Sequence, residues 1–476
     1  MARRSLLDIV TTAIDRLIDA AEPWEGLFPS MLDPDTGEML REIPPAIHGQ
    51  RDGDRAPLGS NLMHDHPTLG LMYDLDAAGV GEGYADAADR YIERFASHCT
   101  GTVSGLFPWG EHSYWQLEAD EIGCGHWPGE PERAIHDHLH QAPVWLWERL
   151  WDLNPDCVSR FAEGLDNHWT EGEPGEPLEY IRHATISKRG RYPRGTRSCD
   201  FPRHGGFYML DWSFAWMRTG CNLFREQTER MLDYWWEKRF DDGLLAVESR
   251  TENGDGRFIG KGSAFQTISL AVSLLDTAEM LAEHDTDLDS TDLAGAMRAR
   301  AEVYLDGFLN APHQPSERIF VYTCDLDEDA PAGPAACWGS VYGSSAAGGP
   351  AVLCLRAHEV TGDGRYVDWA RAVAEWYCET PFPRDVAVPA ADAGMALELL
   401  AGLCEVDGID GWLERGLKLA GDLAGRYCER SLPVGASGID WYESQMLPGY
   451  LLHGIARLAM LAEGRHDAIR MDCTYR

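Results

Sequence analysis

Histidines, carboxylates and aromatic residues gather in four short stretches of the 476-residue sequence: GSNLMHDHPTL, GLFPWGEHSYW, HDHLHQAPVW and GIDWYESQ. Histidine and carboxylate side chains transfer protons near neutral pH, and tryptophan and tyrosine rings offer flat apolar faces to a ligand. The candidates are Asn61, His64, Asp65 and His66; Trp109, Glu111, His112, Tyr114 and Trp115; His136, His138 and His140; and Asp440, Trp441, Tyr442 and Glu443. Because convergent titratable groups mark functional sites, we predict that these stretches meet in one active site.

A basic stretch, residues 182–206, interrupts an otherwise acidic chain. It carries seven Arg or Lys residues and two His against the single acid Asp200, whereas the formal net charge of the whole chain is −37. A local positive field attracts anions, so we predict that Arg182, Arg203 and His204 face an acidic oligosaccharide. The alternative is that these arginines pair with surrounding acids, which contributes little stability per exposed pair.

The predicted reaction is β-elimination of a uronic-acid glycoside by a polysaccharide or oligosaccharide lyase. A cation or amide neutralises the sugar carboxylate, a base removes the acidified C5 proton, and an acid protonates the leaving oxygen. The residues predicted to neutralise the carboxylate are Asn61, Arg182 and Arg203; those for proton transfer are His64, His112, His204, Tyr114, Tyr442 and Glu111; and those for sugar contact are Trp109, Trp115, Trp441 and Tyr208.

Glycoside hydrolysis is the second reaction that these residue types allow. It needs two carboxylates across the scissile bond, one of them with a raised pKa. The carboxylates available in the four stretches are Glu111, Asp65 and Glu443. The chain has 78 Asp and Glu residues, so their presence is weaker evidence than the surplus of histidines and basic groups.

A divalent metal is the one cofactor that the sequence leaves open. The runs HDH (64–66) and HDHLH (136–140) are similar to ligand runs. If residues 136–140 are helical, His136 and His140 share a face and His138 points elsewhere, so His136 and His140 are the predicted metal ligands. The alternative is that they are ordinary residues of a first helical turn.

A helical segment recurs six times along the chain, mostly at intervals of about 70 residues. Clear copies are TGDGRYVDWARAVAEWYCE (361–379), GVGEGYADAADRYIERFAS (79–97) and VDGIDGWLERGLKLAGDLAGRYCE (406–429), and looser copies lie at 153–169, 219–239 and 290–309. An apolar helix precedes each copy, and the expected starts of these helices are near His66, His138, Phe207, Ala264, Gly349 and Ala391. Each pair is joined by a short turn, which predicts a series of helical hairpins.

Helices at about 4–21 and at QMLPGYLLHGIARLAML would add a further pair from the two ends of the chain. We therefore predict an all-α fold, an (α/α) toroid of six or seven hairpins that forms one domain over residues 1–476; the alternative is an open helical solenoid. The long connections are expected at 22–63, 98–135, 170–205, 240–263, 310–348 and 429–445. They precede the apolar helices, so we expect them on one rim, where binding and catalysis usually lie.

Composition excludes several classes of partner. The acid excess argues against nucleic-acid and anionic-membrane binding, and no window approaches a membrane span. The 12 cysteines form no C-x-x-C pair, and the N-terminal stretch is an amphipathic helix rather than a targeting segment. We expect a cytoplasmic monomer or homodimer with reduced cysteines.

The TGDGRY-type turns, the GLFPWGEHSYW loop and the WYESQMLPGY entry into the last helix resemble the six-hairpin glycosidase superfamily and the toroidal polysaccharide lyases. The resemblance covers nearly the whole chain and implies a carbohydrate-active enzyme with its site on the long-loop rim. It does not select a reaction, because such folds host hydrolases, lyases and epimerases similar to the N-acylglucosamine type. The sequence shows no recognisable β-sandwich region of the kind that many larger lyases carry, and no clear match to the paired-aspartate motif of unsaturated-uronyl hydrolases. A non-catalytic scaffold that binds an acidic partner is the alternative from another class.

Overall fold

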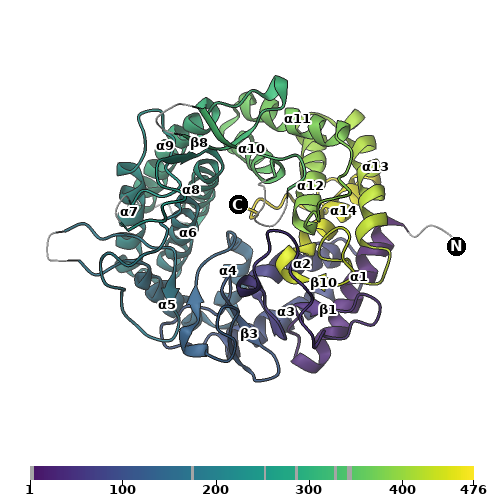
Figure 1. Cartoon of the computed structure of the whole chain (residues 1–476), viewed down its shortest axis with the longest axis horizontal. Coiled ribbons are helices and arrows are strands. Elements are labelled where there is room, and N and C mark those ends of the chain that lie inside the picture. Colours follow the sequence, from purple (N-terminus) through teal and green to yellow (C-terminus); the bar gives the residue numbers. More distant parts are fainter. Residues whose placement is uncertain (1–4, 173–175, 251–252, 285–287, 326–329, 340–345) are drawn as a thin grey trace. The chain divides into compact units, whose positions relative to one another are not determined.

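The computed structural model describes residues 5–172, 176–250, 253–284, 288–325, 330–339 and 346–476. The described residues form α-helices joined by loops that contain short strands (Figure 1). The helices are α1 (Leu6–Ala21), α2 (Leu62–Ala77), α3 (Tyr84–Arg94), α4 (Val144–Leu153), α5 (Pro155–Gly164), α6 (Pro202–Thr219), α7 (Asn222–Glu237), α8 (Ala264–His284), α9 (Leu288–Asn310), α10 (Gly348–Thr361), α11 (Gly364–Glu379), α12 (Ala390–Val406), α13 (Ile409–Tyr427) and α14 (Pro448–Ala462). The all-α prediction is confirmed.

The helices pair along the chain as the repeat predicted. Contacts join α2 to α3, α4 to α5, α6 to α7, α8 to α9, α10 to α11 and α12 to α13. The second helix of every pair coincides with one of the six repeated segments. The fold class is therefore that of the (α/α) toroids, built from successive helical hairpins.

The two helices of a hairpin differ in burial, and the sequence explains the difference. In α12 every residue from Ala390 to Cys404 is buried, which fits its nearly continuous apolar sequence. In α11 one face is buried, including Tyr366 and Trp369, and the Asp363 side chain caps the helix by accepting a hydrogen bond from the Arg365 backbone N–H. The repeated segments therefore form the more exposed helices, and the apolar segments before them form the buried ones.

The chain divides into two compact units by its internal contacts. Unit 1 comprises residues 1–99, 109–131 and 336–475, and unit 2 comprises residues 100–108, 132–335 and 476. In unit 1, α14 packs against α12 and α2, and α1 packs against α13 and α14. This packing confirms the predicted pairing of helices from the two ends of the chain. In unit 2, α6 packs against α8, α7, α5 and α4.

Short antiparallel strands join the long loops within each unit. In unit 1, β1 (Met31–Leu32) pairs with β10 (Tyr442–Glu443), and β3 (Ser113–Gln116) pairs with β2 (Gly59–Ser60) and β4 (Glu121–Cys124). In unit 2, β5 (Ile135–His136) pairs with β6 (Ala184–Thr185), and β8 (Val321–Asp325) pairs with β7 (Lys261–Ser263) and β9 (Ala330–Pro334). Within each unit the loops that precede the buried helices therefore gather, as the rim hypothesis requires.

Two helix starts differ from the prediction. The helix expected near His138 begins at Val144, because Pro143 occupies its N-cap in extended conformation and Ile135 and His136 form a strand instead. The helix expected near Phe207 begins at Pro202, whose fixed φ suits a first helical position. Among the described helices, none is long and apolar enough to span a membrane.

Candidate functional site

Asn61 connects the first turn of α2 to the loop that carries Glu111. Its Oδ1 atom accepts hydrogen bonds from the backbone N–H groups of Met63 and Gly110, at 3.1 and 3.3 Å. Its Nδ2 atom donates to the Gly110 carbonyl at 2.8 Å. The Asn61 amide thus binds backbone groups of Met63 in α2 and of Gly110 in the loop before β3. We infer that its role is to hold this loop against α2. The predicted contact of Asn61 with a sugar carboxylate is not favoured by this arrangement.

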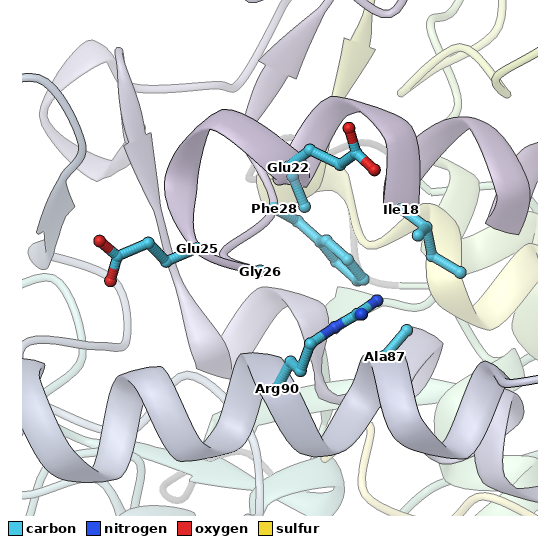
Figure 2. A pocket seen from close by; sticks show the side chains of 8 residues that line it. Ile18, Glu22, Glu25, Gly26, Phe28, Ala87 and Arg90 are labelled. Carbon is cyan, nitrogen blue, oxygen red and sulfur yellow. The ribbon is translucent and has the colours of Figure 1, made fainter.

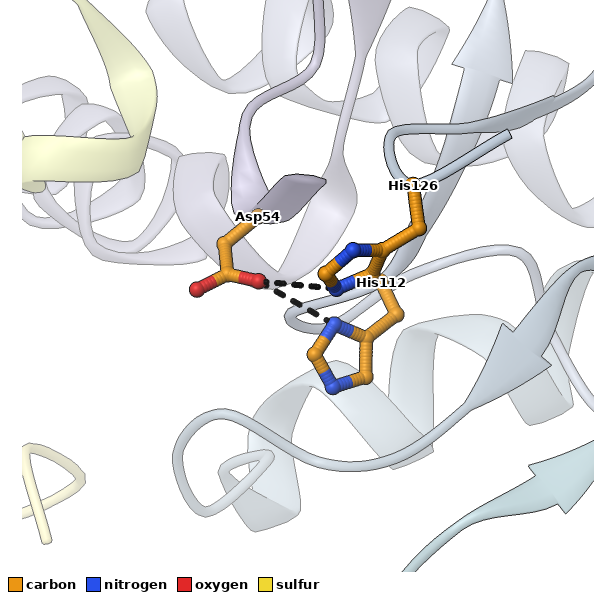
Figure 3. Close-up of side chains that lie close together, drawn as sticks. All are labelled: Asp54, His112 and His126. Atoms are coloured by element: carbon orange, nitrogen blue, oxygen red, sulfur yellow. Dashed lines mark ion pairs between the residues drawn. The ribbon is translucent and has the colours of Figure 1, made fainter. Parts of the chain in front are cut away.

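Beside this turn lies a group of four residues, Asp54, Glu111, His112 and His126, which we call the loop cluster. The His112 Nδ1 and His126 Nε2 atoms each lie 3.3 Å from Asp54 Oδ1, and Figure 3 shows both rings directed at that oxygen. The other ring nitrogen of His112 lies 3.5 Å from Glu111 Oε2. Asp54, Glu111 and His112 are buried, whereas the His126 side chain is 37% exposed. Such an array can transfer protons or hold a cation.

Two glycines allow the segments of the loop cluster to approach. A Cβ atom on Gly53 would lie 2.1 Å from His126 Nδ1, and one on Gly125 would lie 2.2 Å from the Gly53 carbonyl oxygen. Any larger residue at either position would push apart the η2 turn (Asp52–Asp54) and the segment after β4. The absence of these two side chains is why Asp54 and His126 meet although they lie far apart in sequence.

His64 lies near the loop cluster but is held neutral. Burial lowers its pKa from 6.5 to about 3, with a smaller lowering from His66 and an opposing effect of Glu111. Its Nδ1 atom is 3.4 Å from Ser444 Oγ, and its Nε2 atom is 3.4 Å from Asn61 Nδ2. An imidazole with so low a pKa is a weak base at neutral pH, so burial does not favour proton transfer by His64, and its catalytic role stays a prediction.

The neutral His64 predicts a loss of stability in acid. Because its pKa is about 3 in the folded protein and 6.5 in the unfolded chain, unfolding takes up a proton between these values, and stability falls as the pH drops below 6.5. At ~pH 4.5 the residue should cost roughly 2–3 kcal/mol of unfolding free energy. Urea unfolding of His64→Gln across this range should show a correspondingly smaller decline. The control is the exposed residue His48, for which His48→Gln should retain the wild-type slope, and equal slopes in all three proteins would contradict the prediction.

Asp65 and His66 make their hydrogen bonds outside the loop cluster. Asp65 Oδ2 accepts a hydrogen bond from the Tyr91 hydroxyl of α3 at 2.8 Å, and burial raises the Asp65 pKa to about 7. The His66 Nδ1 atom lies 2.9 Å from the Met63 carbonyl oxygen, and its Nε2 atom lies 3.1 Å from Thr474 Oγ1. Asp65 therefore joins α2 to α3, and the HDH run does not form a ligand set in which all three side chains converge.

Glu443, a predicted carboxylate for hydrolysis, is part of a buried ion pair. Its two oxygens accept hydrogen bonds from Arg55 Nε and Nη2 at 2.6 and 2.9 Å, and they also accept from Gln50 and Trp441. Both of its oxygens are therefore occupied by donors from the protein, so the contacts favour a structural role over contact with a substrate. The neighbouring Tyr442 is buried, and its pKa is raised well above 10.0 by burial, so it is a poor base at neutral pH.

Most of the predicted sugar-stacking residues are core residues. Trp109 is fully buried and stacks on Phe95, so it has no face for a sugar. Tyr114 covers Gly59 and Gly123 of the neighbouring strands, and burial raises its pKa to about 12. Trp115 is also buried and donates a hydrogen bond to Asp120, and the half-buried Trp441 donates to Glu443. Trp441 is therefore more exposed than Trp109, Tyr114 and Trp115, which are buried.

In unit 2, acids from outside the basic stretch neutralise much of its charge. Arg191 makes two hydrogen bonds to Asp166, at 2.9 and 2.6 Å. Arg189 and Arg194 also form ion pairs, with Glu163 and Glu176 at 3.8 and 3.6 Å. For these three arginines, the contacts agree with the alternative that the basic stretch pairs with surrounding acids. The prediction that Arg182, Arg203 and His204 face an acidic oligosaccharide does not depend on these three pairs and stays a prediction.

These three residues have separate environments. Arg182 is buried, 3.6 Å from Asp137 Oδ2 and over the Phe201 ring, and its carbonyl accepts a 3.4 Å hydrogen bond from the Tyr208 hydroxyl. Arg203 Nη1 donates to the backbone oxygen of Arg476 at 3.3 Å. His204 is buried and stacks on Phe201. Arg182 and His204 are thus buried, whereas Arg203 is partly exposed.

The predicted metal pair His136 and His140 rested on a helix that is not formed. Residues 137–143 are irregular, so the argument that the two side chains share a helical face is wrong. The His136 Nδ1 atom lies 2.9 Å from His168 Nε2, and the His168 Nδ1 atom lies 2.9 Å from the Ile181 carbonyl oxygen. His168 Nδ1–H must donate to that carbonyl, which makes His136 the donor to His168. Burial lowers the pKa of both rings, that of His168 to about 3.

Other titratable groups were missed by sequence reasoning. The Asp200 side chain of unit 2 accepts hydrogen bonds from the Tyr234 hydroxyl at 2.6 Å and from the Ser249 backbone and hydroxyl at 2.9 and 2.5 Å. Burial and the nearby Asp200 raise the pKa of Glu248 to about 8. Asp54 and His126 were also missed. Their only sequence signals were the Gly-containing RDGDR and CGH stretches, which are common in loops.

A cavity of about 510 Å³ lies between α1, η1 (Glu22–Trp24) and α3, and its lining residues include none of the predicted site residues. Its lining includes Ile18, Phe28 and Arg90, and Figure 2 shows the Glu25 carboxylate directed away from the other side chains. Glu25 forms an ion pair with Arg94 at 3.0 Å. The lining offers no histidine, so we assign no chemistry to this cavity.

Comparisons with known proteins give distant matches, and no family model matches the chain. A pectate disaccharide-lyase of Dickeya dadantii (strain 3937) is 25% identical over 150 residues, which are 31% of this chain and only 26% of that lyase. Solved structures with similar folds include an unsaturated glucuronyl hydrolase specific for heparin (12% identity, TM-score 0.47, 96% of this chain and 98% of that one). A sugar epimerase from a ruminal bacterium is similar at 12% identity and a TM-score of 0.49, over 80% of this chain and 89% of that one. The chain thus resembles carbohydrate-active enzymes of the six-hairpin and (α/α) toroid type.

Proposed function

We propose that this protein is a carbohydrate-active enzyme that cleaves uronate-containing oligosaccharides by β-elimination. The observation that carries this proposal is the loop cluster, in which His112 lies between the carboxylates of Asp54 and Glu111. The short match to a pectate disaccharide-lyase supports an acidic sugar as the substrate class. Because that match covers 26% of the lyase, the linkage cleaved stays open.

The state of the other carboxylates favours elimination over hydrolysis. A hydrolase needs two carboxylates that are available to the substrate. Glu443 is bound by Arg55, and Asp65 is bound by Tyr91, so two of the three candidates serve the fold. Of the three, only Glu111 lies in a cluster with histidines. The second carboxylate of that cluster, Asp54, is 1% exposed and faces the two imidazole rings, so we propose that it is not the partner acid of a hydrolase.

The proposed roles follow from the geometry of the loop cluster. Glu111 is the proposed acceptor of the C5 proton, because its carboxylate lies beside an imidazole that can hold it in place. His112 is the proposed positioning residue, since Asp54 fixes one of its ring nitrogens and Glu111 faces the other. Transfer of a proton by a positioned side chain accelerates reactions by typically 10²–10⁴-fold. His64, Arg182, Arg203 and His204 remain proposed contributors whose roles the contacts above do not define.

The first test is a panel of uronate-containing oligosaccharides, followed in parallel by ultraviolet absorbance and by reducing ends. We expect absorbance and reducing ends to rise together, because elimination leaves an unsaturated uronate at the new end. New reducing ends without absorbance would replace the proposal with hydrolysis. A change at C5 without cleavage, detected by deuterium incorporation from solvent, would indicate an epimerase, and binding without any turnover would indicate a scaffold.

A further inference from the structure

We propose that Asp54, His112 and His126 together bind one divalent transition-metal cation of the Zn²⁺ and Co²⁺ type. This inference concerns binding and stands whether or not the protein is a lyase. The three side chains come from the η2 turn, the loop before β3 and the segment after β4, all within unit 1. Figure 3 shows the two rings meeting at one oxygen of the carboxylate.

The distances match those between ligands of one metal. His112 Nδ1 and His126 Nε2 each lie 3.3 Å from Asp54 Oδ1, and the three ligand atoms all lie within 4.8 Å of one another. Tetrahedral zinc sites have bonds of about 2.0–2.2 Å to nitrogen and oxygen, which places neighbouring ligand atoms about 3.4 Å apart. A cation could therefore bind with small adjustments of these side chains.

The Asp54 carboxylate gives independent support. Asp54 is only 1% exposed, and among the described residues neither of its oxygens accepts a hydrogen bond of normal geometry. Its partners are the two imidazole nitrogens at 3.3 Å from Oδ1, and Arg51 Nη1 lies 3.9 Å from Oδ2. Burying a charge without hydrogen bonds is costly, so such groups are usually paired or bound to a metal. A cation at Oδ1 would satisfy this carboxylate.

Charge and donor type define the class of cation. The loop cluster holds two carboxylates, Asp54 and Glu111, which together attract a positive ion. Imidazole nitrogens suit zinc, cobalt, nickel and iron, whereas calcium and magnesium prefer oxygen ligands only. Glu111 lies 3.5 Å from the ring nitrogen of His112 that faces away from Asp54, which is the position of an outer-shell carboxylate that orients a ligand histidine. Three protein ligands also match catalytic zinc sites, in which water or substrate fills a fourth position.

The test is calorimetric titration of the chelator-treated full chain with Zn²⁺, and with Co²⁺ while the visible absorption of bound cobalt is recorded. We expect one site per chain, with cobalt bands typical of nitrogen and oxygen ligands, and no binding of Ca²⁺ at that site. His126→Ala and Asp54→Asn should each weaken binding by at least about 100-fold, and Glu111→Gln by roughly 10–100-fold. The matched control is His98→Ala, because the His98 side chain is similarly exposed (39% against 37%) and also contacts an aspartate, Asp120.

Each outcome decides the inference. Absence of Zn²⁺ and Co²⁺ binding to the wild type would overturn it, as would equal binding by His126→Ala and wild type. If Asp54→Asn fails to fold, His126→Ala still decides, because His126 lies at the exposed edge of the loop cluster. Since none of these readouts uses an oligosaccharide, failure of the cation site and failure of the lyase proposal are distinguishable.

Discussion

Glu111→Gln is expected to lower kcat on the preferred uronate oligosaccharide by about 10²–10⁴-fold. The amide keeps the size of the side chain and its place beside His112, but it cannot accept a proton. Because the Asn61 side chain holds the backbone of the neighbouring Gly110, the substitution should leave the loop backbone unchanged. Unchanged circular dichroism together with lost turnover would assign the loss to chemistry rather than to folding.

The control for this variant lies in the next loop. Glu118 is a partly exposed carboxylate that pairs with Arg41 at the surface, so Glu118→Gln should retain wild-type turnover. His112→Ala should also be slow, because Glu111 then loses its neighbour, while KM should change less than kcat. Wild-type kcat in Glu111→Gln would remove the loop cluster from the reaction and would move the search to the carboxyl pair Asp200 and Glu248 of unit 2.

The helical hairpins could be predicted from sequence because their signals are local. The TGDGRY turn ends one helix and starts the next, and the Asp363 cap and the apolar face of α11 are read directly from residue types at fixed spacing. Helix starts failed where a proline changed the local geometry. Pro143 delayed α4 and Pro202 advanced α6, since proline fixes φ and lacks an N–H donor.

The site was predictable only in part, because contacts between loops leave little trace in sequence. Glu111 and His112 were identified from a motif rich in chemistry, but Asp54 and His126 join them through two glycines that permit close approach. Glu443 shows the opposite error. It resembles a catalytic carboxylate in the sequence, but Arg55, 388 positions earlier in the chain, binds it. Residue type alone cannot separate a structural carboxylate from a catalytic one.

Arg55→Met is expected to lower the free energy of unfolding by about 3–5 kcal/mol, because it leaves the buried Glu443 carboxylate without its partner. The pair is almost fully buried, with side-chain exposures of 1% and 0%, and it connects the η2 turn to β10. Urea unfolding measures the change. The exposed pair of Arg41 and Glu118 is the matched control, so Arg41→Met should cost no more than about 1 kcal/mol.

A double variant separates the charge from the packing. Adding Glu443→Gln to Arg55→Met removes the unpaired charge and keeps one oxygen that can accept from either Gln50 or Trp441, so it should restore a large part of the lost stability. No restoration would mean that the stability loss comes from the missing arginine side chain and not from the isolated carboxylate. Asp54 directly precedes Arg55, so Arg55→Met should also weaken Zn²⁺ binding. If the Arg55 guanidinium holds the η2 turn in place, the double variant should not restore Zn²⁺ binding.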